Sequence, residues 1–260
     1  MKKTWKVVLA AAVAVLILGG SVAGGLYFFN QDKTVTVEEK KEKAEPEQAE
    51  KDYNAMQGEI VAKAEDPYQS KINFEELQKV NADAYAWIQI PGTNVDYPIL
   101  QSATEADDYY LNTTIDGKAG YPGSIYTERY NSTAFTDPVT VVYGHNMKEK
   151  TMFSQLRNYT DKAFFDSNPY IYIYLPDKTL KYQIFAAVAF DDRYILGSYN
   201  FDDKNDFQKY LDELRSTMDG NVNPDVQVTQ DSKILTLSTC IDEYPEQRWL
   251  VNATLVSQEQ

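Results

Sequence analysis

The hydrophobic positions of this 260-residue chain divide it into three regions. An uncharged apolar run occupies 7–29, a polar and charge-rich segment follows over 30–67, and short apolar runs recur through 68–260. Because about 20 apolar residues span a bilayer core, the first run predicts a single transmembrane helix. The second region has too few large apolar side chains to fold alone, so we expect a flexible stalk there.

The lysines before the apolar run predict its orientation. Lys2, Lys3 and Lys6 precede it, and positive charge is typical of the cytoplasmic side of a membrane span. We therefore expect a cytoplasmic N-terminus over 1–6, a single-pass anchor in the cell membrane and an extracellular domain. The small residues within 19–25 fit a cleaved signal peptide instead, but the run is long for one, which favours an uncleaved anchor.

Region 68–260 has the pattern of a mostly β domain. Its apolar runs have strand length and are separated by turn residues. We expect strands at 86–90, 95–100, 124–127, 139–143, 170–175, 179–190, 226–229, 233–239 and 249–256. Short helices are expected between them, at 152–159 and 161–165. Short strands with inserted helices predict a mostly antiparallel barrel or sandwich.

Two further helices have clearer signals. Asn73, followed by Glu76, forms a pair that is typical of a helix N-terminus. The segment 202–217 predicts an amphipathic helix that ends near Gly220. Its apolar face is expected to comprise Phe207, Tyr210, Leu211, Leu214 and Met218.

Charge and composition narrow the classes of function. The formal net charge is −14, so the surface repels nucleic acid and we expect no nucleic-acid partner. The chain has one cysteine and one histidine. One cysteine excludes an internal disulfide, and one residue of each type is too few for the usual zinc sites. We therefore expect neither a metal nor a cofactor.

Both of these rare residues lie at predicted strand ends. Cys240 directly follows the strand expected at 233–239, and His145 comes just after the strand expected at 139–143. Arg248 opens the next strand, so it meets Cys240 at one end of the sheet if the two strands pair as a hairpin. A thiolate attacks a peptide carbonyl, an imidazole protonates the leaving amine, and a guanidinium stabilises the oxyanion. The three residues are therefore candidates for a cysteine-based acyl-transfer site.

Each of these residues also has a structural interpretation. Cys240 fits a buried core residue of a non-catalytic binding module, and His145 fits a hydrogen-bonded structural residue. Arg248 fits a surface ion pair with Asp242 or Glu243, which contributes little free energy. Among enzymes, a secreted cysteine endopeptidase, in which water resolves the thioacyl intermediate, is a further alternative.

Several sequence motifs resemble the sortases, the cell-wall transpeptidases of Gram-positive bacteria. Residues 236–240 read T-L-S-T-C and match the T-L-x-T-C signature of that family. Residues 87–99 and 143–153 resemble the early strands and the histidine segment of class B sortases, and the helix expected at 202–217 resembles the class B insertion. The resemblance implies a closed β-barrel with an N-terminal helix and an inserted helix before the cysteine strand.

The matching motif positions carry the family's site residues onto this chain. By resemblance, Cys240 is the nucleophile, His145 is the general acid and base, and Arg248 stabilises the substrate or the oxyanion. Substrate-binding positions are implied at Ser238, Thr239, Tyr194 and Ile195.

The resemblance also implies a reaction. The enzyme would cleave the C-terminal sorting signal of a surface protein after its threonine, form a thioacyl intermediate on Cys240 and transfer it to an amine. The expected acceptor is the peptidoglycan cross-bridge. A pilin lysine is the alternative acceptor and would make the chain a pilin-polymerising sortase. The expected partners are sorting-signal-bearing surface proteins together with a cell-wall or pilin amine.

Overall fold

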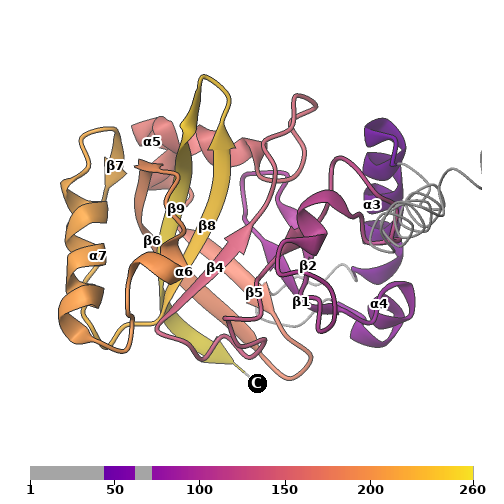
Figure 1. Ribbon diagram of the computed structural model, residues 1–260, viewed down its shortest axis with the longest axis horizontal. Coiled ribbons are helices and arrows are strands. Elements are labelled where there is room, and N and C mark those ends of the chain that lie inside the picture. The colour runs from indigo at the N-terminus through magenta and orange to yellow at the C-terminus, as the bar shows by residue number, and fades with distance from the viewer. Residues whose placement is uncertain (1–43, 62–71, 260) are drawn as a thin grey trace, which may run out of the picture. The chain divides into compact units, whose positions relative to one another are not determined.

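The computed structural model describes residues 44–61 and 72–259, which lie in one compact unit, Lys43–Gln260. Its strands are β1 Ala84–Gln89, β2 Asp96–Leu100, β3 Ile125–Tyr126, β4 Val139–Tyr143, β5 Tyr170–Tyr174, β6 Thr179–Asp191, β7 Gly220–Val222, β8 Ile234–Ile241 and β9 Tyr244–Glu259. They form one sheet in the order β5-β1-β2-β3-β4-β8-β9-β6-β7 (Figure 1). Because β5 also pairs with β6, every strand except β7 belongs to a closed barrel. The predicted mostly β barrel is confirmed.

The strand that carries Cys240 lies between two partners in the barrel wall. β8 pairs in parallel with β4 and antiparallel with β9. The pair β2–β3 is also parallel, within a sheet that is otherwise antiparallel as predicted. Parallel pairing brings the C-terminal ends of β4 and β8 to the same edge of the sheet.

Helices lie between and around the strands. They are α3 Pro46–Ile60, α4 Phe74–Val80, α5 Lys162–Ser167, α6 Ile195–Ser198 and α7 Lys204–Ser216, with the 3-10 helices η1 Tyr109–Asn112 and η2 Ser154–Thr160. The N-cap predicted at Asn73 is confirmed, because its side chain accepts a hydrogen bond from Glu76 N–H at 3.2 Å. The helix predicted over 152–159 is the 3-10 helix η2.

Helix α7 is the predicted inserted helix, and it packs beside β6 and β7 on the outside of the barrel (Figure 1). Asp203 caps its N-terminus by accepting from two backbone N–H groups. Its buried residues are Phe207, Tyr210, Leu211 and Leu214. They pack in one cluster with Phe185, Val188 and Leu250 of the barrel wall. Met218 was expected on this face but is 98% exposed, because the helix ends before it, at Ser216.

One predicted strand is wrong, and another forms in its place. Residues 226–229 are irregular, whereas β7 forms just before them and pairs with β6. Gly220, expected as a helix stop, opens β7 with φ +136°. A Cβ there would lie 2.7 Å from Val188 Cα. The close approach of two strands therefore requires glycine at this position, which helical periodicity could not reveal.

The predicted stalk over 30–67 differs from the structure where the structure describes it. Pro46–Ile60 form helix α3, and its buried residues are Ala49, Tyr53, Met56 and Ile60. This spacing follows the helical period, so one face of α3 packs on the domain. The hydroxyl of Tyr53 donates to Gly123 O at 3.0 Å. The high charge of the segment concealed this narrow apolar stripe, and the folded domain begins before residue 68.

The predicted fold also included a single transmembrane helix over 7–29, and this part is corrected. Among residues 44–61 and 72–259, no helix has the length and apolar content needed to cross a bilayer. The segment 7–29 and the predicted cytoplasmic residues 1–6 lie outside the described residues. The fold of the described chain is thus the barrel with its helices.

Candidate active site

A pocket of about 290 Å³ lies where β4 and β8 end and β9 begins. The segment that follows β6 also lines it. Every residue predicted for the site lines this pocket: His145, Cys240, Arg248, Ser238, Thr239, Tyr194 and Ile195. The structure therefore brings the predicted residues together, while their individual roles stay predictions.

Parallel pairing of β4 with β8 sets the positions of His145 and Cys240. Tyr143 is paired with Ser238, and Gly144 N–H donates to Ser238 O at 3.2 Å. His145 follows Gly144 directly, and Cys240 comes shortly after Ser238 in the neighbouring strand. The backbone ladder between the two strands thus brings the imidazole and the thiol to one edge of the sheet.

Cys240 lies on the solvent side of β8. It is exposed, whereas Thr239 and Ile241 on either side of it are buried. This exposure contradicts the interpretation of Cys240 as a core residue. Thr239 is 2% exposed, and its Oγ1 has no hydrogen-bond partner among the described residues. Thr239 therefore borders the pocket from the buried face of the strand.

Arg248 is paired directly with Cys240 across β8 and β9. The register of the two strands shifts immediately after Cys240, and residues 245–247 form a bulge in β9. Nη1 of Arg248 donates to Pro245 O at 2.8 Å and to Gln247 O at 2.9 Å. The bulge therefore orients the guanidinium, as bulges beside functional sites commonly do.

The structure tests the suggested ion pair of Arg248. In the part of the chain that the structure describes, Arg248 forms no ion pair, so the suggested pairing with Asp242 or Glu243 is wrong. Its Nε and Nη2 have no protein partner in the same part of the chain. These two nitrogens form a planar fork that can donate to a carbonyl oxygen in the pocket.

The imidazole of His145 is held from two sides. Its Nε2 lies 2.7 Å from Leu111 O, and Nε2 carries the hydrogen because a carbonyl oxygen only accepts. The ring of Tyr121 packs on the imidazole, with 4.7 Å between the ring centroids. Burial lowers the pKa of His145 from its ordinary value of 6.5, and the bond to Leu111 O partly offsets this effect. The imidazole is therefore mostly neutral at pH 7, with Nδ1 as its basic nitrogen.

Residues 193–199, the wall segment, form one side of the pocket with Tyr194 and Ile195. Tyr194 is 44% exposed, and its hydroxyl donates to Glu128 Oε2 at 2.5 Å. Burial raises the pKa of Glu128, and the bond from Tyr194 counteracts this rise. Among the described residues Glu128 forms no ion pair, and its side chain lines this side of the pocket.

Sequence reasoning missed several residues of this site, among them Leu111, Tyr121 and Glu128. Leu111 acts through its backbone carbonyl, which no side-chain pattern reveals. Tyr121 lies in a loop far from His145 in the sequence, and only the fold brings the two rings together. Glu128 directly follows the strand predicted at 124–127, and this strand-end position was a signal that could have identified it.

The site combines an exposed thiol, a proton carrier and a partly fixed guanidinium at one pocket. These are the groups that acyl transfer from a peptide through a thioester requires. No group of three or more potential His, Cys, Asp or Glu metal ligands occurs among residues 44–61 and 72–259.

Comparison with known proteins gives independent evidence of the family to which the chain belongs. The family model described as the Sortase domain matches residues 88–256. A sortase B of Listeria monocytogenes is 34% identical over 186 residues, which cover 71% of this chain and 74% of that protein. The X-ray structure of Clostridium perfringens sortase B has a TM-score of 0.64 and 29% identity, covering 71% of this chain and 100% of that chain.

A Staphylococcus aureus sortase B–substrate complex also resembles this chain. It has a TM-score of 0.65 and 28% identity, covering 81% of this chain and 97% of that chain. The residues matched by the family model include every residue predicted for the site.

Proposed function

The chain belongs to the sortase family, as a class B member, and from this premise we propose that Cys240 is the nucleophile of a transpeptidation reaction. The observation that carries the proposal is that Cys240, His145 and Arg248 line one pocket. Cys240 is exposed, and the chain has no other cysteine. A solvent-accessible thiol in a pocket with an imidazole and a guanidinium has the environment that thioester chemistry needs.

His145 moves the proton in this proposal. The thiol of Cys240 gives its proton to Nδ1, and the sulfur attacks the carbonyl carbon of the scissile peptide bond. A C–S bond forms and the C–N bond breaks, and the departing amine takes the proton back from the imidazolium. The hydrogen bond from Nε2–H to Leu111 O supports this role, because it fixes the tautomer that leaves Nδ1 basic.

Arg248 stabilises the oxyanion that forms on the attacked carbonyl. Its Nη1 is held by Pro245 O and Gln247 O, so the guanidinium is oriented before the substrate binds. Donors that are fixed in advance stabilise a transition state without reorganising during the reaction. The direct pairing of Arg248 with Cys240 supports the assignment, because the oxyanion develops next to the sulfur.

The substrate in this proposal is a C-terminal sorting signal, cleaved after its threonine. Tyr194, Ile195, Ser238 and Thr239 line the pocket and would contact the peptide. An amine of the peptidoglycan cross-bridge then attacks the thioester, gives a proton to His145 and releases the thiol of Cys240. Membership in a family of cell-wall enzymes supports catalysis outside the cytoplasm.

Product analysis tests the proposal. Purified protein is incubated with a panel of pentapeptide sorting signals, with and without a short glycine peptide as amine acceptor, and the products are identified by mass spectrometry. We expect a new amide product that appears only with the acceptor, and its loss in Cys240→Ala and His145→Ala. Hydrolysis that the acceptor does not change would overturn transpeptidation and favour the cysteine endopeptidase.

The same assay tests a pilin lysine as the acceptor. A lysine side-chain amine replaces the glycine peptide as acceptor at matched concentration. We expect the glycine amine to be used more efficiently. Preferential use of the lysine amine would replace the cross-bridge with a pilin as the acceptor.

A further inference from the structure

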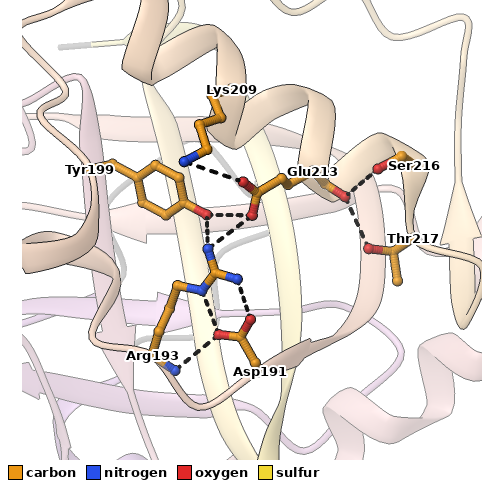
Figure 2. A network of polar contacts seen from close by, with 7 residues as sticks. All are labelled: Asp191, Arg193, Tyr199, Lys209, Glu213, Ser216 and Thr217. Atoms are coloured by element: carbon orange, nitrogen blue, oxygen red, sulfur yellow. Dashed lines mark hydrogen bonds and ion pairs between the residues drawn. The ribbon is translucent and has the colours of Figure 1, made fainter.

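Both ends of the wall segment are hydrogen-bonded to a single carboxylate oxygen on helix α7. Nη1 of Arg193 and the hydroxyl of Tyr199 both donate to Glu213 Oε2, at 3.1 Å and 2.7 Å (Figure 2). We infer that Glu213 is a positioning residue for peptide binding, which holds the wall segment and its Tyr194 in place. The role in peptide binding rests on the proposed function, whereas the attachment of the wall segment to Glu213 does not.

Arg193 is oriented toward α7 by a local ion pair. Its Nε donates to Asp191 Oδ1 at 2.6 Å, and its Nη2 bonds the other oxygen of the same carboxylate (Figure 2). Arg193 holds the pKa of Asp191 below its usual value through these bonds. This two-point contact leaves Nη1 directed at Glu213 and Tyr199. The ion pair with Asp191 thus orients the guanidinium of Arg193, and the bond to Glu213 attaches that guanidinium to helix α7.

Helix α7 is a suitable fixed element for this attachment. Four of its residues are buried in the cluster that packs on the barrel wall. Glu213 lies on the same helix with a side chain that is 29% exposed, and its second oxygen faces Lys209 at 3.9 Å. Glu213 does not line the pocket, so it acts on a bound peptide only through the residues it holds.

The wall segment has a second attachment on the pocket side. Tyr194 bonds Glu128, and its ring also packs against Gly197, where a Cβ would lie 2.6 Å from the ring. If Glu213 were removed, Tyr194 would keep its hydrogen bond to Glu128 and its ring contact with Tyr130, and Ile195 and Tyr199 would stay packed in the cluster with α7. Both ends of the wall segment would nevertheless lose their hydrogen bonds to the helix. We therefore expect loss of order in the wall segment rather than unfolding of the domain.

The expected effect of removing the Glu213 side chain depends on how exposed its ion pairs and hydrogen bonds are. Exposed ion pairs contribute little individually, whereas hydrogen bonds to a charged group contribute more. For Glu213→Ala we expect KM for a sorting-signal peptide to rise roughly 3- to 10-fold, with kcat within about two-fold of the wild type. Glu213→Gln keeps an oxygen acceptor but loses the charge, so its effect should be smaller.

Asp212 on the same helix provides a matched control. It is exposed, and its side chain accepts a hydrogen bond from Gln208 of the same helix. Asp212→Ala removes the same charge from α7 without touching the wall segment. We expect it to leave KM unchanged, and an equal rise in KM for both alanine variants would overturn the inference.

Two further measurements separate this inference from the proposed function. Amide hydrogen exchange over 193–199 should accelerate in Glu213→Ala and stay unchanged in Asp212→Ala. Alkylation of Cys240 by iodoacetamide should proceed at the wild-type rate in both variants. Slower alkylation together with a lower kcat would contradict a positioning role.

If the wild-type protein joins no peptide to any amine, the proposed function fails. The exchange comparison then still decides whether Glu213 holds the wall segment. Unchanged exchange in Glu213→Ala would overturn that structural role.

Discussion

Cys240 and Arg248 face each other directly across β8 and β9, and the strand register shifts immediately after this pair. In the proposed mechanism, one guanidinium then has two sets of contacts. Nη1 bonds the carbonyl oxygens of the bulge, while the remaining nitrogens can donate to a substrate oxygen.

We expect Arg248→Lys to lower turnover by about 100-fold, because an ammonium lacks the planar fork whose separate nitrogens can donate to the bulge and to the oxyanion. Steady-state kinetics with a sorting-signal peptide measure this loss. The thermal unfolding midpoint should stay close to that of the wild type, since the side chain is only half-buried. Near-normal turnover would remove Arg248 from the mechanism.

His145 should titrate below pH 6.5, because burial disfavours the imidazolium. The chain has a single histidine, so its imidazole signals in an NMR titration are unambiguous. We also expect the neutral ring to carry its hydrogen on Nε2, as the bond to Leu111 O requires. A midpoint above 6.5 would contradict the burial argument.

The same lowered pKa makes stability depend on pH. The folded imidazole binds a proton less readily than the unfolded one. As pH falls below about 6.5, the unfolded state is therefore protonated first, and the free energy of unfolding decreases until the folded imidazole is protonated too. Urea unfolding of the wild type and of His145→Gln between pH 7.5 and pH 5 should show a smaller decrease in the variant. The same pH dependence in the wild type and in His145→Gln would show that His145 does not contribute to the change in unfolding free energy.

The thiol of Cys240 should react with a small alkylating reagent in the folded protein. It is exposed and is the only thiol in the chain, so each modified molecule reports on the site. Mass spectrometry measures the rate, and a bound sorting-signal peptide should slow it. Resistance to alkylation until the protein unfolds would identify Cys240 as a buried structural residue.

Gly144→Ala should destabilise the domain and impair turnover. A Cβ at this position would lie 2.7 Å from the ring of Phe153 and closer still to Ile125 Cδ1. Overpacking of this kind costs about 1–3 kcal/mol, and relief would displace the adjacent His145. Gly58→Ala is the control, because a methyl group added at this position of α3 would have no neighbouring atom within 4 Å. Urea unfolding should show that variant to be neutral or slightly stabilised.

Tyr53→Phe should lower the free energy of unfolding by roughly 1–2 kcal/mol, because its buried hydroxyl bonds Gly123 O and Ser124 Oγ. Tyr130 is 70% exposed, so Tyr130→Phe should leave stability unchanged. Chemical denaturation measures both variants. Equal stability of Tyr53→Phe and the wild type would contradict the docking of α3 on the domain.

Sequence patterns predicted those elements of the fold that depend on interactions between residues close together in the chain. The strand at 139–143 has the predicted bounds, and the N-cap at Asn73 forms as expected. Cys240 and His145 were identified because they lie at strand ends, where a short apolar run stops. Their meeting at one pocket depends on the parallel pairing of β4 with β8, which the sequence did not reveal.

Non-local contacts explain what the sequence did not reveal. Leu111 contributes only a carbonyl oxygen, and its neighbour His145 comes from a distant strand end. Gly220 is needed because two backbones approach closely in β7 and β6. Helix α3 has a narrow apolar face within a highly charged segment, so composition alone indicated a stalk. In each case the deciding partner lies far away in the sequence.

Only Asp242 and Glu243 connect β8 to β9. The relative position of Cys240 and Arg248 is therefore set by the backbone pairing of β8 with β9 and does not depend on the conformation of a long loop. Substitutions within 194–198, which lie outside both strands, are therefore expected to leave the pairing of Cys240 with Arg248 unchanged.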